Sequence, residues 1–172
     1  MIHIVLYEPE IPQNTGNIAR TCAAAGATLH LVRPFSFELS DRYLKRAGLD
    51  YFNMVRIVVH DDFEACRDDC PGLPMFFFTT KGARPYTSFV YSADAMLVFG
   101  KETRGLPEAL LRKHPDRCAR IPMLSGARSL NLSNSVAVAL YEALRQNDFA
   151  GLQDTSGLSG RDEAASRWVD YL

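Results

Sequence analysis

Short apolar segments alternate with helix-forming segments along most of this chain, and this alternation restricts the possible fold more than any other feature. The apolar segments have the length and composition of buried strands, and they are residues 3–7, 27–32, 55–60, 74–80, 95–100 and 118–122. The helix-forming segments are residues 14–26, a short basic stretch that ends near Gly48, and residues 61–69, 106–114 and 133–146. Because helices separate the strands almost throughout, the sequence predicts an α/β fold with a mostly parallel sheet flanked by helices.

The chain divides into a long uniform part and a short tail. No Pro-rich or Ser-rich linker interrupts residues 1–150, so we expect a single domain there. Residues 151–172 are rich in Gly, Ser and charge up to Trp168, which is typical of a flexible connector that ends in a small anchor. In that interpretation Trp168 and Tyr171 dock on the domain or on a partner subunit. Disorder of the tail is the alternative.

Composition narrows the class of protein. Of the 172 residues, 47% are hydrophobic and 23% are charged, as in a globular protein. No segment has the roughly 18 to 20 consecutive apolar residues that cross a membrane, and the first residues lack the pattern of a signal peptide. The four cysteines are scattered, which suits reduced thiols rather than a disulfide framework. We therefore expect a cytoplasmic protein without a membrane segment.

The cysteines and histidines give no metal-binding pattern in the sequence. Cys66 and Cys70 are four residues apart on a predicted helix, but no nearby Cys or His pair completes a tetrahedral set. The histidines sit at strand or helix positions without a ligand pattern around them, and they are His3, His30, His60 and His114. We therefore expect no metal site and structural roles for these histidines.

The net charge of -1 argues against indiscriminate binding to nucleic acid, which depends on neutralising phosphates with Lys and Arg. Any RNA site must then be a local patch. Arg42, Lys45 and Arg46 are the best candidates, because spacings of three and four residues gather them on one side of a short helix. A solvated helix face is the alternative for these three residues.

Ligands of parallel α/β sheets bind beyond the carboxyl ends of the strands, so the segments that leave the strands are candidate sites. After the first strand, Asn14, Asn17 and Arg20 recur at intervals of three, within an arc of roughly 120° on a helix. An exposed polar helix face is the alternative. The segment lacks the three-glycine spacing of a dinucleotide fingerprint.

A second segment, FGKETRGLP at residues 99–107, leaves a buried strand and passes two glycines before a helix starts. Gly100 and Gly105 permit a sharp bend and close approach of the backbone to a ligand. Between them, Glu102 and Arg104 either belong to a site or only pair with each other at the surface.

Two further segments carry polar residues beyond strands. Helix capping explains one or two of the small polar residues within residues 121–135, but not all of Ser125, Gly126, Ser129, Asn131, Ser133 and Asn134. Residues 76–82 end an apolar strand in hydroxyls and Lys81, for which an ordinary strand end is the favoured interpretation.

Four motifs together resemble those of the SPOUT (SpoU-TrmD) RNA methyltransferases in order and spacing: IPQNTGNIAR, TTKG, FGKETRGLP, and IPM followed by RSLNLSNSVAVALYEALRQ. YEPEIPQNTGNIAR and KRAGLDY resemble more closely the small TrmL-type tRNA (cytidine/uridine-2'-O)-methyltransferases. The resemblance covers about residues 1–150. It implies a deep C-terminal trefoil knot, a homodimer, S-adenosylmethionine bound in the knot, and methylation of the wobble ribose in the anticodon stem-loop of tRNA.

The resemblance also implies roles for individual residues. The cofactor pocket would be lined by Phe78, Thr79, Gly100, Gly105, Ile121, Met123, Ser129 and Leu130. The family assigns catalysis to Arg20. Because arginine is essentially never deprotonated in proteins, we expect Arg20 to clamp a phosphate and stabilise charge on the 2'-oxygen, oriented by Asn14, Glu102 and Asn134. Tyr141 and Arg145 are candidate substrate contacts, with packing and surface charge as the alternative.

The resemblance leaves other functions open. A related enzyme of this superfamily methylates another tRNA position or rRNA, and a nonenzymatic RNA-binding module that retains the pocket is a possibility from a different class. The sequence departs from the family pattern at Lys101, where relatives commonly have proline, and in its tail after Gly151, which is longer than in close relatives.

Overall fold

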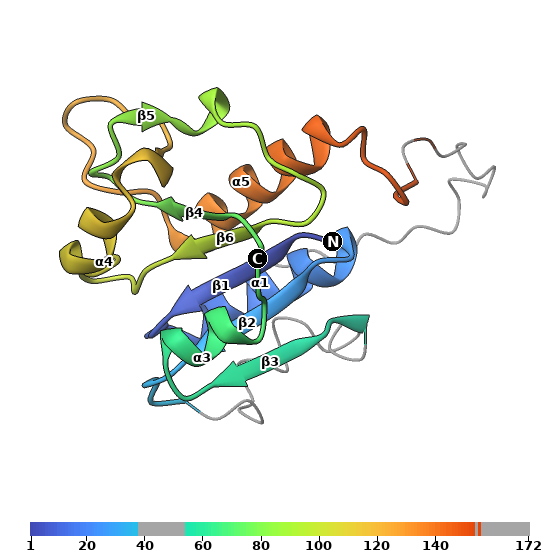
Figure 1. Cartoon of the computed structure of the whole chain (residues 1–172), viewed down its shortest axis with the longest axis horizontal. Coiled ribbons are helices and arrows are strands. Elements are labelled where there is room, and N and C mark those ends of the chain that lie inside the picture. The colour runs from blue at the N-terminus through green and yellow to red at the C-terminus, as the bar shows by residue number, and fades with distance from the viewer. Residues whose placement is uncertain (38–53, 154, 156–172) are drawn as a thin grey trace, which may run out of the picture.

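A computed structural model describes residues 1–37, 54–153 and 155 of the chain. Its strands are β1 (His3–Tyr7), β2 (Thr28–Val32), β3 (Ile57–His60), β4 (Met75–Phe78), β5 (Arg84–Pro85), β6 (Met96–Phe99) and β7 (Cys118–Arg120). Its helices are α1 (Pro12–Ala25), α3 (Phe63–Asp68), α4 (Glu108–Lys113) and α5 (Leu132–Gln146), with 3-10 turns η2 (Tyr86–Ser88) and η3 (Pro115–Arg117). Among the described residues, the strands form one seven-stranded sheet in which every pairing is parallel (Figure 1).

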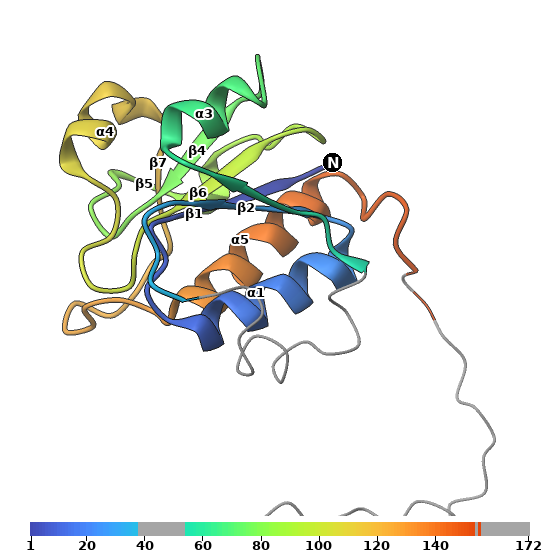
Figure 2. The same cartoon turned by 90° about the horizontal axis from the view of Figure 1, so that it is seen from below.

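Helices cover both faces of the sheet, so the predicted α/β architecture is confirmed. Figure 2 shows α1 and α5 against one face and α3 and α4 against the other. Ile18 and Cys22 of α1 and Leu140 of α5 are fully buried against the first face. Phe63 and Cys66 of α3 pack in a second apolar cluster on the opposite face. This double cover explains why β4 and β6 are apolar on both sides rather than alternating.

The two long helices end where the sequence predicts, but α1 starts two residues and α5 one residue before the predicted segments. Pro12 occupies the first turn of α1, where its missing N–H is not needed, and Gly26 ends the helix in the left-handed conformation with φ of 64°. At α5, the Asn131 side chain accepts hydrogen bonds from the backbone N–H groups of Ser133 and Asn134. The C-terminus of α1 and the N-terminus of α5 are therefore fixed by local chemistry.

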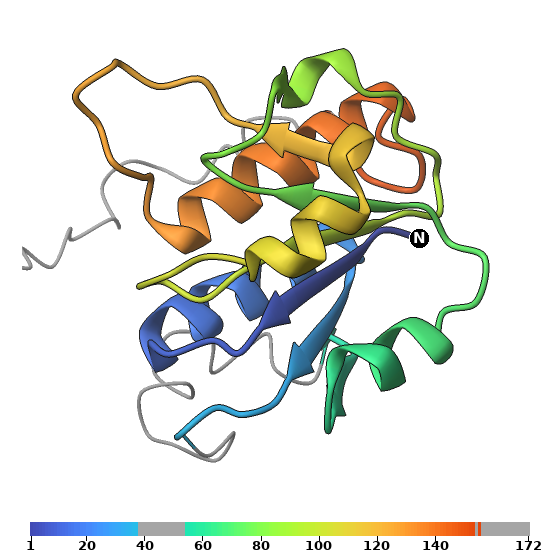
Figure 3. The same ribbon diagram turned by 60° about the vertical axis from the view of Figure 1, so that its left-hand side comes forward.

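The order of the strands across the sheet is β3-β2-β1-β6-β4-β7-β5. The chain adds β2 and β3 on one side of β1 and then places the other four strands on the opposite side of β1, with β6 next to it. Such a change of side opens a crevice between the carboxyl ends of the two central strands, here β1 and β6. In Figure 3 the strands end toward one edge of the sheet, where residues 121–131 (orange) also project. The fold thus brings the segments after β1, β6 and β7 to one edge.

Most of the predicted elements are present, with two kinds of exception. Strand β5 was not predicted, because two exposed residues carry no apolar pattern, and its identity comes from pairing with β7. The predicted basic helix with Arg42, Lys45 and Arg46 lies outside the described residues, as do Trp168 and Tyr171 of the tail. Within the described part of the chain, no helix combines the length and apolarity that crossing a membrane requires.

Candidate active site

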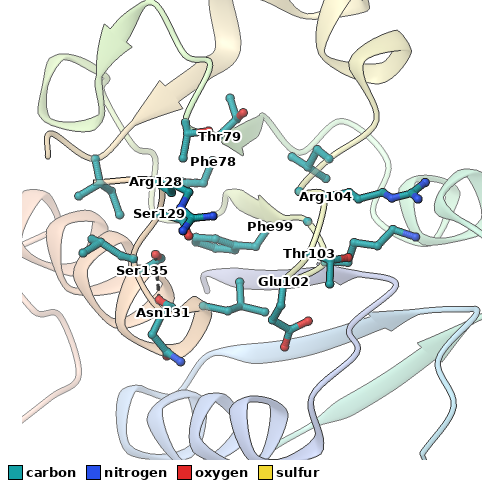
Figure 4. Close-up of a pocket in the computed structure, with 18 of the residues that line it drawn as sticks. Phe78, Thr79, Phe99, Glu102, Thr103, Arg104, Arg128, Ser129, Asn131 and Ser135 are labelled. Carbon is teal, nitrogen blue, oxygen red and sulfur yellow. Dashed lines mark hydrogen bonds between the residues drawn. The ribbon is translucent and has the colours of Figure 1, made fainter. Parts of the chain in front are cut away.

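A cavity of about 630 Å³ lies at the carboxyl ends of β4, β6 and β7. It is lined by residues from the three segments that leave these strands, together with Ile11 and Asn14 at the start of α1. The resemblance had implied eight cofactor contacts, and all of them line it: Phe78, Thr79, Gly100, Gly105, Ile121, Met123, Ser129 and Leu130. Figure 4 shows Phe78, Thr79 and Ser129 of this set around the cavity, on separate segments of the chain. Residues spread over about 50 positions of the sequence are therefore gathered around one cavity.

Aromatic rings form the floor of this cavity. Phe78 at the end of β4 and Phe99 at the end of β6 stack with their ring centroids 4.7 Å apart, and both are buried. Their strands are neighbours in the sheet and the two residues are directly paired in register. Ile121, Met123 and Leu130 add aliphatic wall from the segment after β7. The result is a concave slot with an apolar floor and one aliphatic wall, of a volume typical of small-molecule sites.

The turn after β6 brings two stretches of backbone into direct contact. The Gly105 N–H donates to the Lys101 carbonyl at 2.8 Å, and Gly105 has φ of 67°, which favours glycine. A Cβ on Gly100 would lie 2.0 Å from the Gly105 carbonyl carbon and 2.2 Å from the Leu106 nitrogen. Only glycine fits at position 100 with this backbone, so the shape of the cavity depends on it.

The turn after β4 is fixed in a similar way. The Thr79 N–H donates to the Ala119 carbonyl at 3.0 Å, and the Thr79 hydroxyl accepts from the Lys81 N–H at 3.2 Å. Lys81 forms an ion pair with Glu108 of α4, whose pKa is held below its usual range by this hydrogen bond and charge. The TTKG residues, for which an ordinary strand end was favoured, therefore form one wall of the cavity.

Three side chains form a hydrogen-bonded chain at the polar end of the cavity. The Asn131 Nδ2 donates to the Asn14 Oδ1 at 3.0 Å, and the Asn14 Nδ2 donates to the Glu102 Oε1 at 3.0 Å. Asn14 is only 6% exposed, so its amide needs both partners. These residues come from α1, the turn after β6 and the N-cap of α5. The chain therefore ties together all three segments that surround the crevice.

Glu102 belongs to this site rather than to a surface ion pair with Arg104. Its carboxylate accepts hydrogen bonds from the backbone N–H groups of Glu10 at 2.9 Å and Ile11 at 3.3 Å. In return, the Glu10 carboxylate accepts from the Thr103 N–H and hydroxyl, each at 3.0 Å. Reciprocal hydrogen bonds thus connect the loop after β1 to the loop after β6.

Lys101, at the position where the resemblance leads us to expect proline, joins the same two loops. Its ammonium forms a half-buried ion pair with Glu8, the residue that follows β1. A proline at this position could not form that pair. Lys101 therefore provides an electrostatic contact across the crevice.

Four of the predicted functional residues lie away from the cavity lining. Arg20 is exposed on α1, about two helical turns and roughly 9 Å along the axis from Asn14. Asn134 is exposed in the first turn of α5, and Tyr141 and Arg145 are exposed further along it. Arg145 forms an ion pair with Glu142 at 2.8 Å. Within a single chain, the structure brings Asn14 and Glu102 together but not Arg20 or Asn134 with them.

Asn131 is the site residue that sequence reasoning did not single out for a catalytic role. The sequence marked it as one of several small polar residues, of which Asn134 was chosen instead. Asn131 combines two functions, since its oxygen caps α5 and its amide nitrogen reaches Asn14. Its position immediately before a long apolar-periodic helix is an N-cap signal, which identifies the residue but not its second contact.

The structure places histidines that are distant in the sequence beside Cys66 and Cys70. Parallel strands β1, β2 and β3 align His3, His30 and His60 on the face covered by α3, next to both cysteines. The residues are far apart in sequence, so spacing gave no sign of their proximity.

Comparisons with known proteins agree with this geometry. The model of the SpoU rRNA methylase family matches residues 1–141. The tRNA (cytidine(34)-2'-O)-methyltransferase of Methylovorus glucosotrophus (strain SIP3-4) is 53% identical over 152 residues, which cover 88% of this chain and 99% of that protein.

Solved structures give the same result. A structure from work on the 2-OH methylation of C/U34 on tRNA is 48% identical, with a TM-score of 0.82, and the match covers 86% of this chain and 97% of that one. The SpoU methyltransferase AviRb from Streptomyces viridochromogenes, solved in complex with the cofactor AdoMet, is 27% identical with a TM-score of 0.73, over 85% of this chain and 57% of that one. Sequence, fold and cavity thus lead to one assignment: the chain belongs to the SpoU rRNA methylase family.

Proposed function

We propose that this protein is an S-adenosylmethionine-dependent methyltransferase that modifies the ribose 2'-oxygen of nucleotide 34, the wobble position, in tRNA. The observation that carries the proposal is the cavity at the carboxyl ends of β4, β6 and β7, with the polar chain of Asn131, Asn14 and Glu102 at one end of it. Relatives about half identical over nearly their whole length, with the names given above, support the substrate.

The cavity suits S-adenosylmethionine in size and chemistry. A volume of about 630 Å³ lies within the usual range for small-molecule pockets. The flat rings of Phe78 and Phe99 and the aliphatic side chain of Ile121 offer apolar contact to an adenine ring. The close approach of the backbone at Gly100 keeps the slot narrow. The Ser129 and Thr79 groups supply polar partners. When bound, the cofactor supplies a methyl group on a positively charged sulfur.

The protein's own task is to make the ribose hydroxyl reactive. A 2'-hydroxyl is a weak nucleophile until it loses its proton or its developing negative charge is stabilised. Arg20 provides a permanent positive charge and a planar fork of donors, which suit a phosphate oxygen and a developing alkoxide. Asn14 and Glu102 hold the loops that border the ribose in register. In this mechanism Arg20 acts by electrostatics and not as a base.

The distance of Arg20 from the cavity lining supports a homodimer that completes the site. Large hydrophobic side chains are exposed around α1 and α5, namely Ile11, Leu130, Val138 and Tyr141. An interface over these residues places α1 of one subunit near the cavity of the other, and Arg20 with it. Two subunits also combine their basic residues around a single stem-loop, which a chain of net charge -1 needs.

Disruption of this interface should remove activity without removing the fold. We expect Val138→Glu to give a monomer, because a carboxylate at an apolar interface loses its hydration without gaining a partner. Light scattering after gel filtration measures the mass. Lys113→Glu on α4, outside the exposed hydrophobic group, is the matched control and should leave the dimer intact. A monomeric wild-type protein at micromolar concentration would contradict the dimer.

The knot and the domain boundaries are also part of the proposal. We infer that residues 1–150 form one methyltransferase domain and that its C-terminal part is threaded as the trefoil knot the family implies. The neighbouring strands β4, β6 and β7, with their loops around one cavity, support this. Arg42, Lys45, Arg46, Tyr141 and Arg145 remain predicted RNA contacts, the first three in a segment outside the described residues.

The two roles of Asn131 can be separated by substitution. Asn131→Asp keeps the oxygen that caps α5 but removes the amide donor to Asn14, so we expect kcat to fall about tenfold while the stability contributed by the cap is retained. Asn131→Ala removes both functions and should also cost about 1 kcal/mol of stability. Steady-state kinetics and thermal denaturation measure the two effects. Equal kcat in Asn131→Asp and wild type would show that the contact to Asn14 has no catalytic value.

Methylation of defined anticodon stem-loops tests the function directly. The purified full chain is incubated with methyl-labelled S-adenosylmethionine and stem-loops that carry cytidine or uridine at position 34, and the digested nucleosides are analysed. We expect 2'-O-methylated nucleoside from position 34 and none from the matched RNA with a 2'-deoxynucleotide there. Label at another position, or transfer to an rRNA fragment alone, would replace the proposed substrate. Binding of both ligands without transfer would favour a nonenzymatic RNA-binding module.

A further inference from the structure

A row of three histidines crosses the sheet on the face opposite α1 and α5. His3 Nδ1 lies 2.8 Å from His30 Nε2, and His30 Nδ1 lies 2.9 Å from His60 Nε2. Each neighbouring pair of rings has its centroids 5.1 Å apart. The residues lie on β1, β2 and β3, two positions further along in each successive strand, so their side chains share one face. The methyltransfer mechanism uses none of them.

Cysteines of α3 and the residues after it close over this row. Three donor atoms, one each from His30, His60 and Cys66, lie within 4.8 Å of one another. All three residues are buried. His3, His30 and Cys70 form a second such group, which shares His30. Two imidazoles and a thiol form the nitrogen and sulfur donor set that zinc and similar cations prefer.

A carboxylate behind His60 favours the first group. Asp69 Oδ2 lies 3.3 Å from His60 Nδ1, the ring nitrogen that faces away from His30. A histidine that binds a metal typically donates its other N–H to a carboxylate, which fixes the tautomer and leaves the first nitrogen bare. Asp69 thus prepares His60 Nε2 as a ligand. For His30 the corresponding partner is His3, whose Nδ1 lies next to His30 Nε2, the ring nitrogen that faces away from His60.

We propose that His30, His60 and Cys66 form a structural binding site for one divalent cation of the zinc type, with Asp69 orienting His60. The site ties α3 to β2 and β3, at the edge of the sheet furthest from the cavity. It is independent of the proposed methyltransferase activity. Its donor atoms need shifts of up to about 1 Å to reach the spacing of tetrahedral ligands.

Cation binding changes the protonation of two ligands. The metal–sulfur bond forms as the Cys66 thiol loses its proton to solvent. The proton on His30 Nδ1 moves to Nε2, which then donates a hydrogen bond to His3 Nδ1. One proton is released per cation.

Metal titration of the full chain tests the proposal. Protein freed of metal by a chelator is titrated with Zn²⁺ against a chromophoric competitor, and with Co²⁺ followed by absorption. We expect one cation per chain with a Kd of about 1 µM or tighter, a thiolate-to-cobalt charge-transfer band, and the intense d–d bands of four-coordinate cobalt. Calorimetry in buffers of different ionisation enthalpy should give one released proton. A Kd weaker than about 100 µM, or no charge-transfer band, would overturn the site.

Two pairs of variants distinguish this site from adventitious binding. Cys66→Ala should weaken Zn²⁺ binding at least about a hundredfold, whereas Cys118→Ala, a buried cysteine in the same apolar cluster, should leave it unchanged. Asp69→Ala should weaken it about tenfold, whereas Asp68→Ala, an exposed neighbour paired with Arg67, should not. Asp69 is exposed, so its replacement does not depend on core packing. Equal affinity in Cys66→Ala and Cys118→Ala would refute the assigned ligands.

Discussion

Arg20→Ala is expected to lower kcat of methyl transfer by about a thousandfold while the affinity for S-adenosylmethionine stays within about threefold of wild type. The guanidinium acts on charge that develops on the 2'-oxygen, so its loss is felt in the transition state and not in cofactor binding. Single-turnover kinetics with a stem-loop RNA and calorimetry with the cofactor measure the two quantities. Arg67→Ala, which removes an exposed arginine of α3, is the matched control and should retain full activity.

The proposed dimer makes a second form of this experiment possible. If Arg20 of one subunit serves the cavity of the other, mixing Arg20→Ala and Gly100→Ala subunits restores one complete site in each mixed dimer. Random assortment makes half of the dimers mixed, so about a quarter of wild-type activity should return. No recovery would mean that Arg20 serves the cavity of its own chain. Near-normal turnover of Arg20→Ala alone would refute its proposed role.

Gly100→Ala is expected to abolish measurable cofactor binding, with an affinity at least about a hundredfold weaker than wild type. The new methyl group would lie 2.0 Å from the backbone carbonyl carbon of Gly105. No side-chain rotation can relieve this clash, because the contact is with backbone. The turn after β6 must therefore move, and with it Lys101, Glu102 and the narrow wall of the cavity. We also expect a loss of about 2 to 3 kcal/mol in the free energy of unfolding, measured by denaturant titration.

Gly126→Ala provides the comparison for this substitution. Gly126 lies in the segment that leads from β7 to α5, but a Cβ there meets nothing within 4 Å. Its replacement should leave both cofactor affinity and stability close to wild type. An affinity of Gly100→Ala within about threefold of Gly126→Ala would show that the close backbone contact does not shape the binding site.

Most of the fold was predictable because short stretches of neighbouring residues determine where strands and helices form. The apolar strands, the end of α1 at Gly26 and the apolar periodicity of α5 each depend on residues within a few positions of one another. The cavity lining was also anticipated, but through motif resemblance, since nothing in the periodicity joins Phe78 to Ile121. What sequence alone missed were contacts between distant segments.

The histidine row shows why such contacts escape sequence reasoning. His3, His30 and His60 are about 30 residues apart, and only the parallel register of three strands brings their rings into contact. Likewise, Asn131 and Asn134 are equally plausible polar residues in the sequence. Their roles differ because the N-cap geometry directs Asn131 toward Asn14, while Asn134 is the third residue of α5 and is exposed.

The polar chain at the cavity also has a consequence for how the protein is made. Asn14 is separated by 88 residues from Glu102 and by 117 residues from Asn131. Contacts between such distant positions form late, because closing long loops costs entropy before the contact repays it. A chain that has left the ribosome only as far as Arg120 carries all seven strands of the sheet but lacks the third wall. If the cavity binds the proposed cofactor, tight binding is therefore expected only of molecules whose synthesis and folding have both reached α5.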